Sequence, residues 1–186
     1  MLWYNLKMTI FFTSDTHWGH SRVIQYSNRP FANIDEMDEQ LIKNWNSKVQ
    51  PNDTVYHLGD FAFHREDQIF KILSRLNGKI HLIVGNHDKQ IIKNSQLQKQ
   101  FQSISNYCEL KIDNQFIVMC HYPMLSWNKS HHGSWMLHGH CHGSIQHPWN
   151  GKLLDVGTDP MKYFPISFDK LIPIMASKQF VNHHED

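Results

Sequence analysis

Apolar and polar residues alternate along this chain with two different periods, and each change of period predicts a boundary between elements. Short runs rich in apolar, β-branched and aromatic residues are typical of strands, and they occupy residues 8–14, 53–58, 79–84, 109–113, 116–121, 135–138 and 153–156. Asn114 and Gln115 separate two of these runs, so we expect a β-hairpin with its turn at this pair. The polar stretch 123–134 is expected to form a surface loop.

Two longer stretches carry apolar residues at helical spacing. The apolar positions of residues 34–49 are Ile34, Met37, Leu41, Ile42, Trp45 and Val49. Asn33 followed by Glu36 gives this helix an N-cap signal. Residues 66–77 form the second expected helix, with Gly78 as its C-terminal cap. The order strand, helix, strand, helix, strand, followed by a strand-rich half, predicts an α/β fold.

Length and composition restrict the class of protein without identifying it. The 186 residues suffice for one core, so we expect 1–186 to be a single domain. A net charge of +1 gives no argument for a general affinity for nucleic acid or membranes. Three cysteines without paired spacing make a disulfide framework unexpected, so we expect a cytoplasmic location. Met8 is an alternative start that would leave residues 1–7 as an extension.

Five short motifs carry the polar residues that suggest chemistry, and each closes or follows an apolar run. They are Asp15-Thr16-His17, Gly59-Asp60, Gly85-Asn86-His87-Asp88, His121 and Gly139-His140-Cys141-His142. Histidine is also frequent, with 15 residues against 18 lysines and arginines combined. Carboxylates, imidazoles and one amide make a ligand set for two divalent ions rather than for one structural zinc. We therefore expect a hydrolase that acts on phosphate esters with a pair of metal ions.

The spacing within the motifs suggests how the side chains converge. Asp15 and His17 are two residues apart at a strand end, so we expect them to point the same way. His140 and His142 repeat this arrangement.

Three residues have the chemistry for distinct roles. Asp60 follows a glycine turn between the other candidate ligands and is the natural carboxylate to bridge two ions. Asn86 is a neutral ligand that would leave the ions electrophilic. A metal-bound water would attack phosphorus, and His87 would protonate the leaving oxygen.

Taken in order, the five motifs resemble the signature of the calcineurin-like metallophosphoesterase superfamily, D-x-H, G-D, G-N-H-[D/E], H and G-H-x-H. Residues 14–20, 28–31 and 55–61 resemble more narrowly a branch of small bacterial and phage phosphoesterases. The resemblance implies two packed mixed β-sheets flanked by helices, a four-layer sandwich with the site at the strand ends. It implies one metal ion on Asp15, His17, Asp60 and His142, and a second on Asp60, Asn86, His121 and His140. It also implies that His87 is the general acid.

The sequence differs from other branches of this superfamily at positions that distinguish their activities. Phosphoprotein phosphatases carry G-D-x-x-D-R-G, whereas residues 61–64 read Phe-Ala-Phe-His here, so the Asp-Arg pair is missing. Phe63 stands where purple acid phosphatases carry a ligand tyrosine. A chain of 186 residues leaves little room for the capping domain of the nuclease branch. A phosphodiester carries one negative charge and needs fewer cationic clamps than a phosphomonoester dianion, so we expect a phosphodiesterase.

Residues near the motifs are candidates for contacting the substrate. His20 and His64 are considered for this role. Arg22 and Arg29 are candidates to clamp phosphate oxygens, and we favour Arg29. The expected partner is a small phosphate ester, nucleotide-like or cyclic, and nucleic acid is considered only as a substrate.

Two further expectations concern the base and the metals. Trp18 and Trp127 are candidates to stack on a base. Nitrogen and oxygen ligands suit Mn²⁺, which we expect first, and also Fe²⁺, Zn²⁺, Co²⁺ or Ni²⁺.

Three other functions stay open on the sequence alone. The chain could be a phosphomonoesterase of the same fold or a non-catalytic metal-binding scaffold. The adjacent pair His87-Asp88 also occurs in a class of helical metal phosphohydrolases. Because the motifs follow strand-like runs, the all-helical class is disfavoured.

Overall fold

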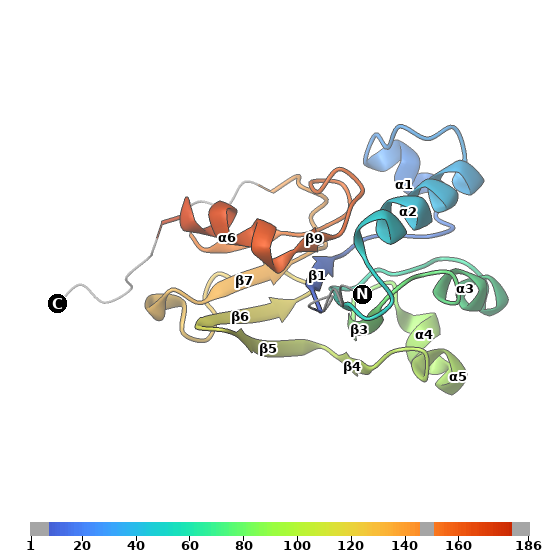
Figure 1. Cartoon of the computed structure of the whole chain (residues 1–186). Helices are drawn as coiled ribbons and strands as arrows, with labels where there is room; N and C mark the ends of the chain where they lie inside the picture. Colours follow the sequence, from blue (N-terminus) through green and yellow to red (C-terminus); the bar gives the residue numbers. More distant parts are fainter. Residues whose placement is uncertain (1–7, 146–150, 180–186) are drawn as a thin grey trace, which may run out of the picture.

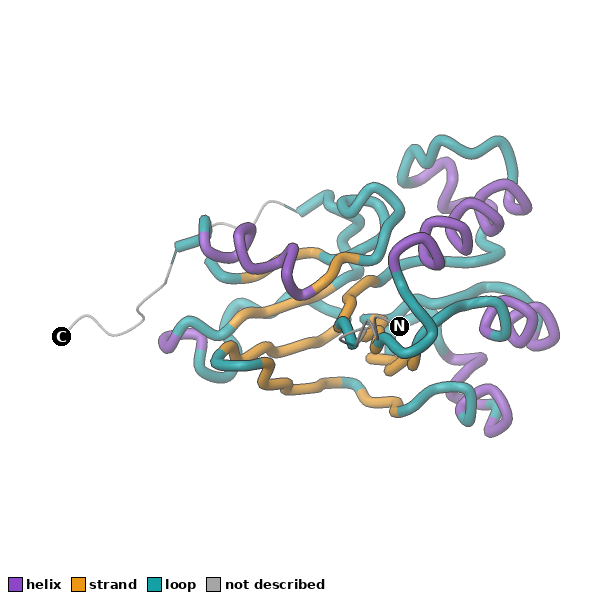
Figure 2. Tube along the Cα trace, viewed as in Figure 1, coloured by secondary structure: helices purple, strands orange, loops and turns teal. Residues whose placement is uncertain are grey.

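Two β-sheets lie at the centre of the structure, a computed structural model that describes residues 8–145 and 151–179 (Figures 1 and 2). The strands are β1 (Ile10–Thr13), β2 (Thr54–His57), β3 (Lys79–Ile83), β4 (Ser103–Ser105), β5 (Tyr107–Ile112), β6 (Gln115–Cys120), β7 (Trp135–His138), β8 (Leu153–Asp155) and β9 (Ile166–Ser167). The helices are α1 (Ser21–Tyr26), α2 (Ile34–Lys48), α3 (Glu66–Leu73), α4 (Lys89–Lys93), α5 (Ser95–Gln98), α6 (Phe168–Ala176) and a 3₁₀ turn at Ser130–His132. The considered extension 1–7 lies outside the described residues.

Both sheets are mixed. The first has the order β4-β3-β2-β1-β9, in which β1 to β4 pair in parallel and β9 pairs antiparallel with β1. The second has the order β5-β6-β7-β8, with an antiparallel β5–β6 hairpin and parallel β6, β7 and β8. Figure 1 shows α1 to α5 on one side of the molecule and the second sheet with α6 on the other. The prediction of two mixed sheets flanked by helices is confirmed.

Side chains alternate along the strands, so each sheet contributes to an apolar cluster on both of its faces. On β1, Phe11 belongs to the cluster on the helical side, whereas Phe12 belongs to the cluster between the sheets. On β6, Ile117 and Met119 face the same inter-sheet cluster, whereas Val118 lies in a third cluster on the outer face. This period of two fixes which side chains of each strand face the core between the sheets.

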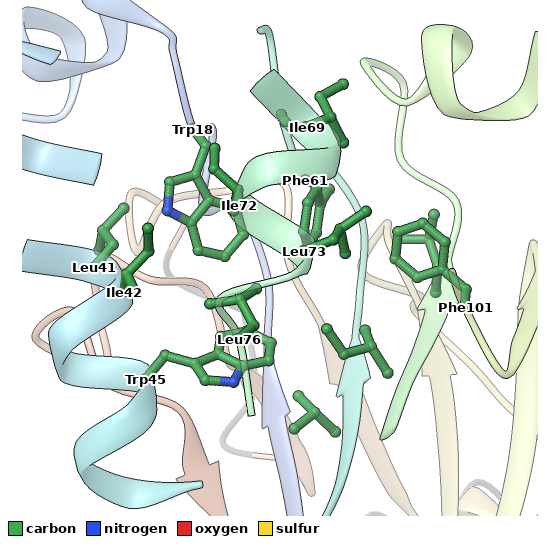
Figure 3. Packing of buried hydrophobic residues seen from close by; sticks show 14 of the residues in the cluster. Trp18, Leu41, Ile42, Trp45, Phe61, Ile69, Ile72, Leu73, Leu76 and Phe101 are labelled. Atoms are coloured by element: carbon green, nitrogen blue, oxygen red, sulfur yellow. The ribbon is translucent and has the colours of Figure 1, made fainter. Parts of the chain in front are cut away.

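The cluster under the helices holds α2 and α3 against the first sheet (Figure 3). Its labelled residues include Leu41, Ile42 and Trp45 from α2, which pack near Ile69 and Ile72 from α3. Burial of such side chains stabilises the fold by about 1.5–3 kcal/mol each. The predicted N-cap is also present, since Asn33 Oδ1 accepts a hydrogen bond from the Glu36 N–H at 2.9 Å.

The second predicted helix ends earlier than expected. It stops at Leu73 rather than at residue 77, so Gly78 is not its immediate cap. Side chains of α2 satisfy the backbone beyond it, because Asn46 donates to the Arg75 carbonyl at 2.8 Å and accepts from the Asn77 N–H at 2.9 Å. These long-range partners replace the hydrogen bonds of another helical turn.

The hairpin turn lies one residue earlier than predicted. Ile112 pairs with Gln115, so Asp113 and Asn114 form the turn. Asp113 has φ 51°, a left-handed conformation that aspartate tolerates in turns. Within the described residues, no helix is long and apolar enough to cross a membrane.

Candidate metal centre

The five motifs meet at one edge of the two sheets. β1, β2 and β3 run parallel, so the loops that follow them carry residues 15–17, 59–60 and 85–88 to the same edge. β6 and β7 are also parallel and end next to His121 and residues 139–142. Ser14 forms a bridge with Gly157, which links the end of β1 to the segment after β8.

Glycines let two of these loops touch. Gly59 has φ 95°, and a Cβ at this position would lie 2.6 Å from the Gly85 nitrogen. A side chain at Gly85 would in turn collide with the carboxylate of Asp60. The two loops can therefore approach closely only with glycine at both positions, because larger residues would separate them.

Asp88 fastens the same two loops together. Its Oδ2 accepts from the N–H groups of Asp60 at 2.9 Å and Gly85 at 2.8 Å, and its Oδ1 accepts from Phe61 at 2.8 Å. The carboxylate is 1% exposed. Burial raises the pKa of Asp88, although the hydrogen bonds oppose that shift. The motif at residues 85–88 contains Asp88, but no local signal indicates this role.

Two groups of side chains in this region could each hold a metal ion. The first comprises Asp15, His17 and His142, and the second comprises Asp60, His121 and His140; in each group the ligand atoms lie within 4.8 Å of one another. These six residues come from loops up to 127 positions apart, between 15 and 142. The seventh predicted ligand, Asn86, places its Oδ1 3.0 Å from His121 Nε2 and so lies beside the second group.

Asp60 lies between the two groups. Its Oδ2 is 3.6 Å from His17 Nε2 in the first group and 3.6 Å from His121 Nε2 in the second. His121 Nδ1 donates to the Leu58 carbonyl at 2.7 Å, which leaves the lone pair on Nε2, the nitrogen that faces Asp60 and Asn86. One carboxylate oxygen is thus equidistant from an imidazole of each group, as a bridging ligand requires.

The backbone at these residues is unusual. Asp15, His17, Asp60, His140 and His142 all have positive φ, between 50° and 69°. Residues other than glycine rarely adopt this region, and such strain concentrates at functional sites. The expectation that ligands two apart converge because of strand alternation is therefore wrong in its cause: they lie in left-handed turns beyond the strand ends.

Asp15 and His17 of the first ligand group are buried, and their charged forms are not fully compensated by neighbouring groups. Burial raises the pKa of Asp15 to about 8, with the charge of His142 opposing the shift. Burial likewise lowers the pKa of His17. Within the described part of the chain, Asp15 Oδ1 and His17 Nε2 are buried without a hydrogen-bond partner. A divalent cation would compensate both atoms, so the residues present fit the implied metal.

A cavity of about 540 Å³ opens onto the two groups. Its lining includes His17, Asp60, Asn86, His140 and His142 together with His87, the predicted general acid, and His20. The ring of His20 stacks on Phe63 with a centroid distance of 3.9 Å. Helix α1 forms one wall through Arg22, Val23 and Tyr26. The sequence indicated neither this short helix nor Tyr26, because six residues are too few for a clear period.

Arg29 does not line this cavity, contrary to the role considered for it. The side chain is buried, and its Nε and Nη2 atoms donate to Asp159 at 2.8 and 2.9 Å. Its remaining donors reach the carbonyls of Asp15 and Thr16 and the sulfur of Met37. All five N–H groups of the guanidinium are thus engaged by the protein, so the phosphate clamp is not supported.

His64, Trp18 and Trp127 also lie outside this cavity, whereas His20 and Arg22 line it. His64 Nε2 lies 2.5 Å from Asp38 Oδ2 and is not among the residues that line the cavity. Trp18 is fully buried in the cluster of Figure 3, and Trp127 packs against the outer face of the second sheet. Stacking of a base on Trp18 is therefore a wrong prediction, because its faces contact protein. Trp127 is half-buried and does not line the cavity, so stacking on it gains no support from this site.

Comparisons with known proteins agree with this geometry. The family description "Calcineurin-like phosphoesterase superfamily domain" matches residues 8–153, which include all five motifs. An uncharacterized protein of Methanocaldococcus jannaschii is 32% identical over 184 residues, covering 95% of this chain and 97% of that protein. The gene 66 protein of Mycobacterium phage L5 is 28% identical over 161 residues, covering 72% of this chain and 77% of the phage protein.

A crystal structure supports the same fold. A protein of unknown function from Aquifex aeolicus matches with a TM-score of 0.69 at 22% identity, covering 90% of this chain and all of that one. The resemblance to the superfamily is thus confirmed, with relatives in a phage and an archaeon. The chain belongs to the calcineurin-like phosphoesterase superfamily, a family of metal-dependent hydrolases of phosphate esters.

Proposed function

We propose that this protein is a phosphodiesterase with two metal ions that hydrolyses small, nucleotide-like or cyclic phosphodiesters. The observation that carries the proposal is the position of Asp60 Oδ2, 3.6 Å from an imidazole nitrogen of each candidate ligand group. A carboxylate placed in this way suits a pair of ions better than a single structural ion.

The proposed ligands follow the two groups. Asp15, His17, Asp60 and His142 would hold one ion, and Asp60, Asn86, His121 and His140 would hold the other. Two such ions, when bound, supply Lewis acidity toward phosphoryl oxygens and lower the pKa of water. Manganese is the proposed native metal, because the donors are nitrogen and oxygen atoms without a thiolate.

His87 is proposed to protonate the leaving oxygen. It is an exposed residue of the cavity wall, so a substrate can reach its ring. Its position is set by the backbone, since the His87 N–H donates to Asp60 Oδ1 at 2.9 Å. The same carboxylate therefore anchors the backbone of the proposed acid beside the two ligand groups.

The cavity wall favours a diester with an aromatic substituent. Among the described residues that line the cavity, Arg22 alone carries a permanent positive charge, which matches one phosphate charge better than two. Tyr26 is 71% exposed and Phe63 is 37% exposed, so both aromatic side chains are accessible at the cavity wall. Such faces can stack on a base, and each stack contributes about 1–3 kcal/mol.

The test is the relative kcat/KM for bis-nitrophenyl phosphate, nitrophenyl phosphate and a 2′,3′-cyclic nucleotide, each measured with Mn²⁺. We expect both diesters to exceed the monoester. A clear preference for the monoester would replace the proposal by a phosphomonoesterase of the same fold, and no turnover with any metal would favour a non-catalytic scaffold.

Recognition of the base is tested separately. Tyr26→Ala should raise KM for the cyclic nucleotide about 5-fold or more, which corresponds to about 1 kcal/mol of stacking. Tyr107→Ala is the matched control, because Tyr107 is an exposed tyrosine on β5 that does not line the cavity. Equal KM values for the two variants would remove Tyr26 from substrate binding.

A further inference from the structure

A buried ion pair lies directly behind the first candidate ligand group. Arg29 and Asp159 are joined by two parallel hydrogen bonds, from Nε to Oδ1 at 2.8 Å and from Nη2 to Oδ2 at 2.9 Å. The side chain of Arg29 is 0% exposed and that of Asp159 is 9% exposed. Removing two charges from water is costly unless their remaining hydrogen-bonding atoms are satisfied, so the other contacts of the pair are informative.

The contacts of Arg29 lead to the first ligand motif. Its Nη2 donates to the Asp15 carbonyl at 2.7 Å, and its Nη1 donates to the Thr16 carbonyl at 2.9 Å. Asp15 is in the left-handed region with φ 55°, a conformation that needs support from its surroundings. Arg29 thus holds the backbone of a candidate ligand in its strained turn.

The contacts of Asp159 lead to the last ligand motif. Its Oδ2 lies 2.6 Å from His142 Nδ1, and Ser27 Oγ lies 3.2 Å from the same nitrogen. An ionised carboxylate can only accept, so Nδ1 carries the proton and the lone pair is left on Nε2. That Nε2 is 3.9 Å from Asp15 Oδ1, on the side of the candidate metal position.

The two ligand groups differ in this respect. His121 in the second group donates its Nδ1–H to the backbone carbonyl of Leu58, which is a neutral acceptor. His142 in the first group instead faces a carboxylate that is itself held by an arginine. A carboxylate behind an imidazole orients the ring and makes its other nitrogen a stronger ligand.

We propose that Asp159, held by Arg29, is a positioning residue that orients His142 and sets the metal affinity of the Asp15–His17–His142 position alone. This inference rests on the proposed binuclear site and adds to it a residue outside the five motifs. It also gives Arg29 a role, since its guanidinium binds the turn at residues 15–16 directly and reaches His142 through Asp159.

The test is calorimetric titration of the metal-free full chain with Mn²⁺. Wild type should bind two ions, and Asp159→Asn should bind one ion as before and the other about 10–100-fold more weakly. Asp53→Asn is the matched control, because Asp53 is also a buried carboxylate. It accepts hydrogen bonds from the N–H groups of Thr9 and Gln50 at 2.8 and 2.7 Å. It precedes β2, at the end of the strand away from the candidate metal site. This control should keep both affinities.

A purely structural ion pair would give a different result. Asp159→Asn would then lower the melting temperature of the metal-free protein while leaving both Mn²⁺ affinities unchanged, which would overturn the inference. If wild type itself bound fewer than two ions, the proposed binuclear site would fail first.

A second measurement does not depend on the variant being folded. Nitrogen-15 NMR of histidine-labelled wild type loaded with Zn²⁺ should show His142 protonated at Nδ1 and liganded through Nε2. Ligation through Nδ1, or an unprotonated Nδ1, would contradict the proposal.

Discussion

The loops that carry Asp60 and Asn86 depend on one buried carboxylate, and its replacement by an isosteric amide gives a quantitative prediction. Asp88 accepts three backbone hydrogen bonds, from Asp60, Phe61 and Gly85, at 2.8–2.9 Å. In Asp88→Asn only one oxygen remains. If this oxygen accepts from Asp60 and Gly85, the new NH₂ group faces the Phe61 N–H, and two donors oppose each other in a buried place.

The magnitude follows from these contacts. A buried donor left without an acceptor costs about 1–3 kcal/mol, and two charge-assisted bonds that become neutral lose about 1 kcal/mol each. Burial raises the pKa of Asp88, which means that the carboxylate is itself partly disfavoured in this environment. We therefore take the lower part of the range and expect Asp88→Asn to reduce the free energy of unfolding by about 3 kcal/mol.

Urea unfolding of the chelated protein, followed by tryptophan fluorescence, measures this change without a contribution from metal binding. In thermal unfolding the same loss corresponds to about 6–12 °C for a chain of this size. Asp113→Asn is the control, because Asp113 is exposed in the hairpin turn and should change stability by less than about 0.5 kcal/mol. A loss below about 1 kcal/mol in Asp88→Asn would refute the assigned role of its three hydrogen bonds.

Three further predictions concern the proposed bridge Asp60, the proposed acid His87 and the buried histidine His57 of β2. Asp60→Asn should lose the metal pair while the exposed Asp169→Asn keeps it, and elemental analysis that found two ions per Asp60→Asn chain would rule out the bridge. His87→Ala should retain both ions but lose about 10²–10⁴-fold in kcat for esters with poor leaving groups, and less for nitrophenyl esters; an equal loss for both would exclude acid catalysis. Burial lowers the pKa of His57 from 6.5 to about 3 in the folded protein. Between pH 6.5 and pH 3 the unfolded chain therefore binds one more proton at this residue than the folded chain does. The unfolding free energy should therefore fall as pH drops through this range, by up to about 1.4 kcal/mol per pH unit from this group, and His57→Gln should show a correspondingly shallower pH dependence in urea unfolding.

The sequence predicted the elements whose pattern is long or strongly apolar. Helix α2 was foreseen because its apolar stripe and its Asn33 cap are both local signals. Helix α6 was not, since Pro173 interrupts a short amphipathic run, and β9 has only two residues that depend on pairing with β1. Elements of this kind are determined by tertiary contacts that a local pattern does not contain.

The candidate site shows the same division between local and long-range information. Its proposed ligands were recognisable because their motifs are contiguous in sequence. The role of Arg29 was mistaken because its partner Asp159 is 130 residues away. Likewise, nothing local shows that Trp18 turns into the core or that the chain places Asp15 and Asp60 at positive φ.

A pair of manganese ions that shares Asp60 would be located by anomalous diffraction from crystals grown with Mn²⁺. We expect two manganese peaks about 3.5–4 Å apart, one on each side of Asp60 Oδ2, with His17 and His121 on opposite ions. A single peak, or two peaks of which one does not contact Asp60, would contradict this expectation.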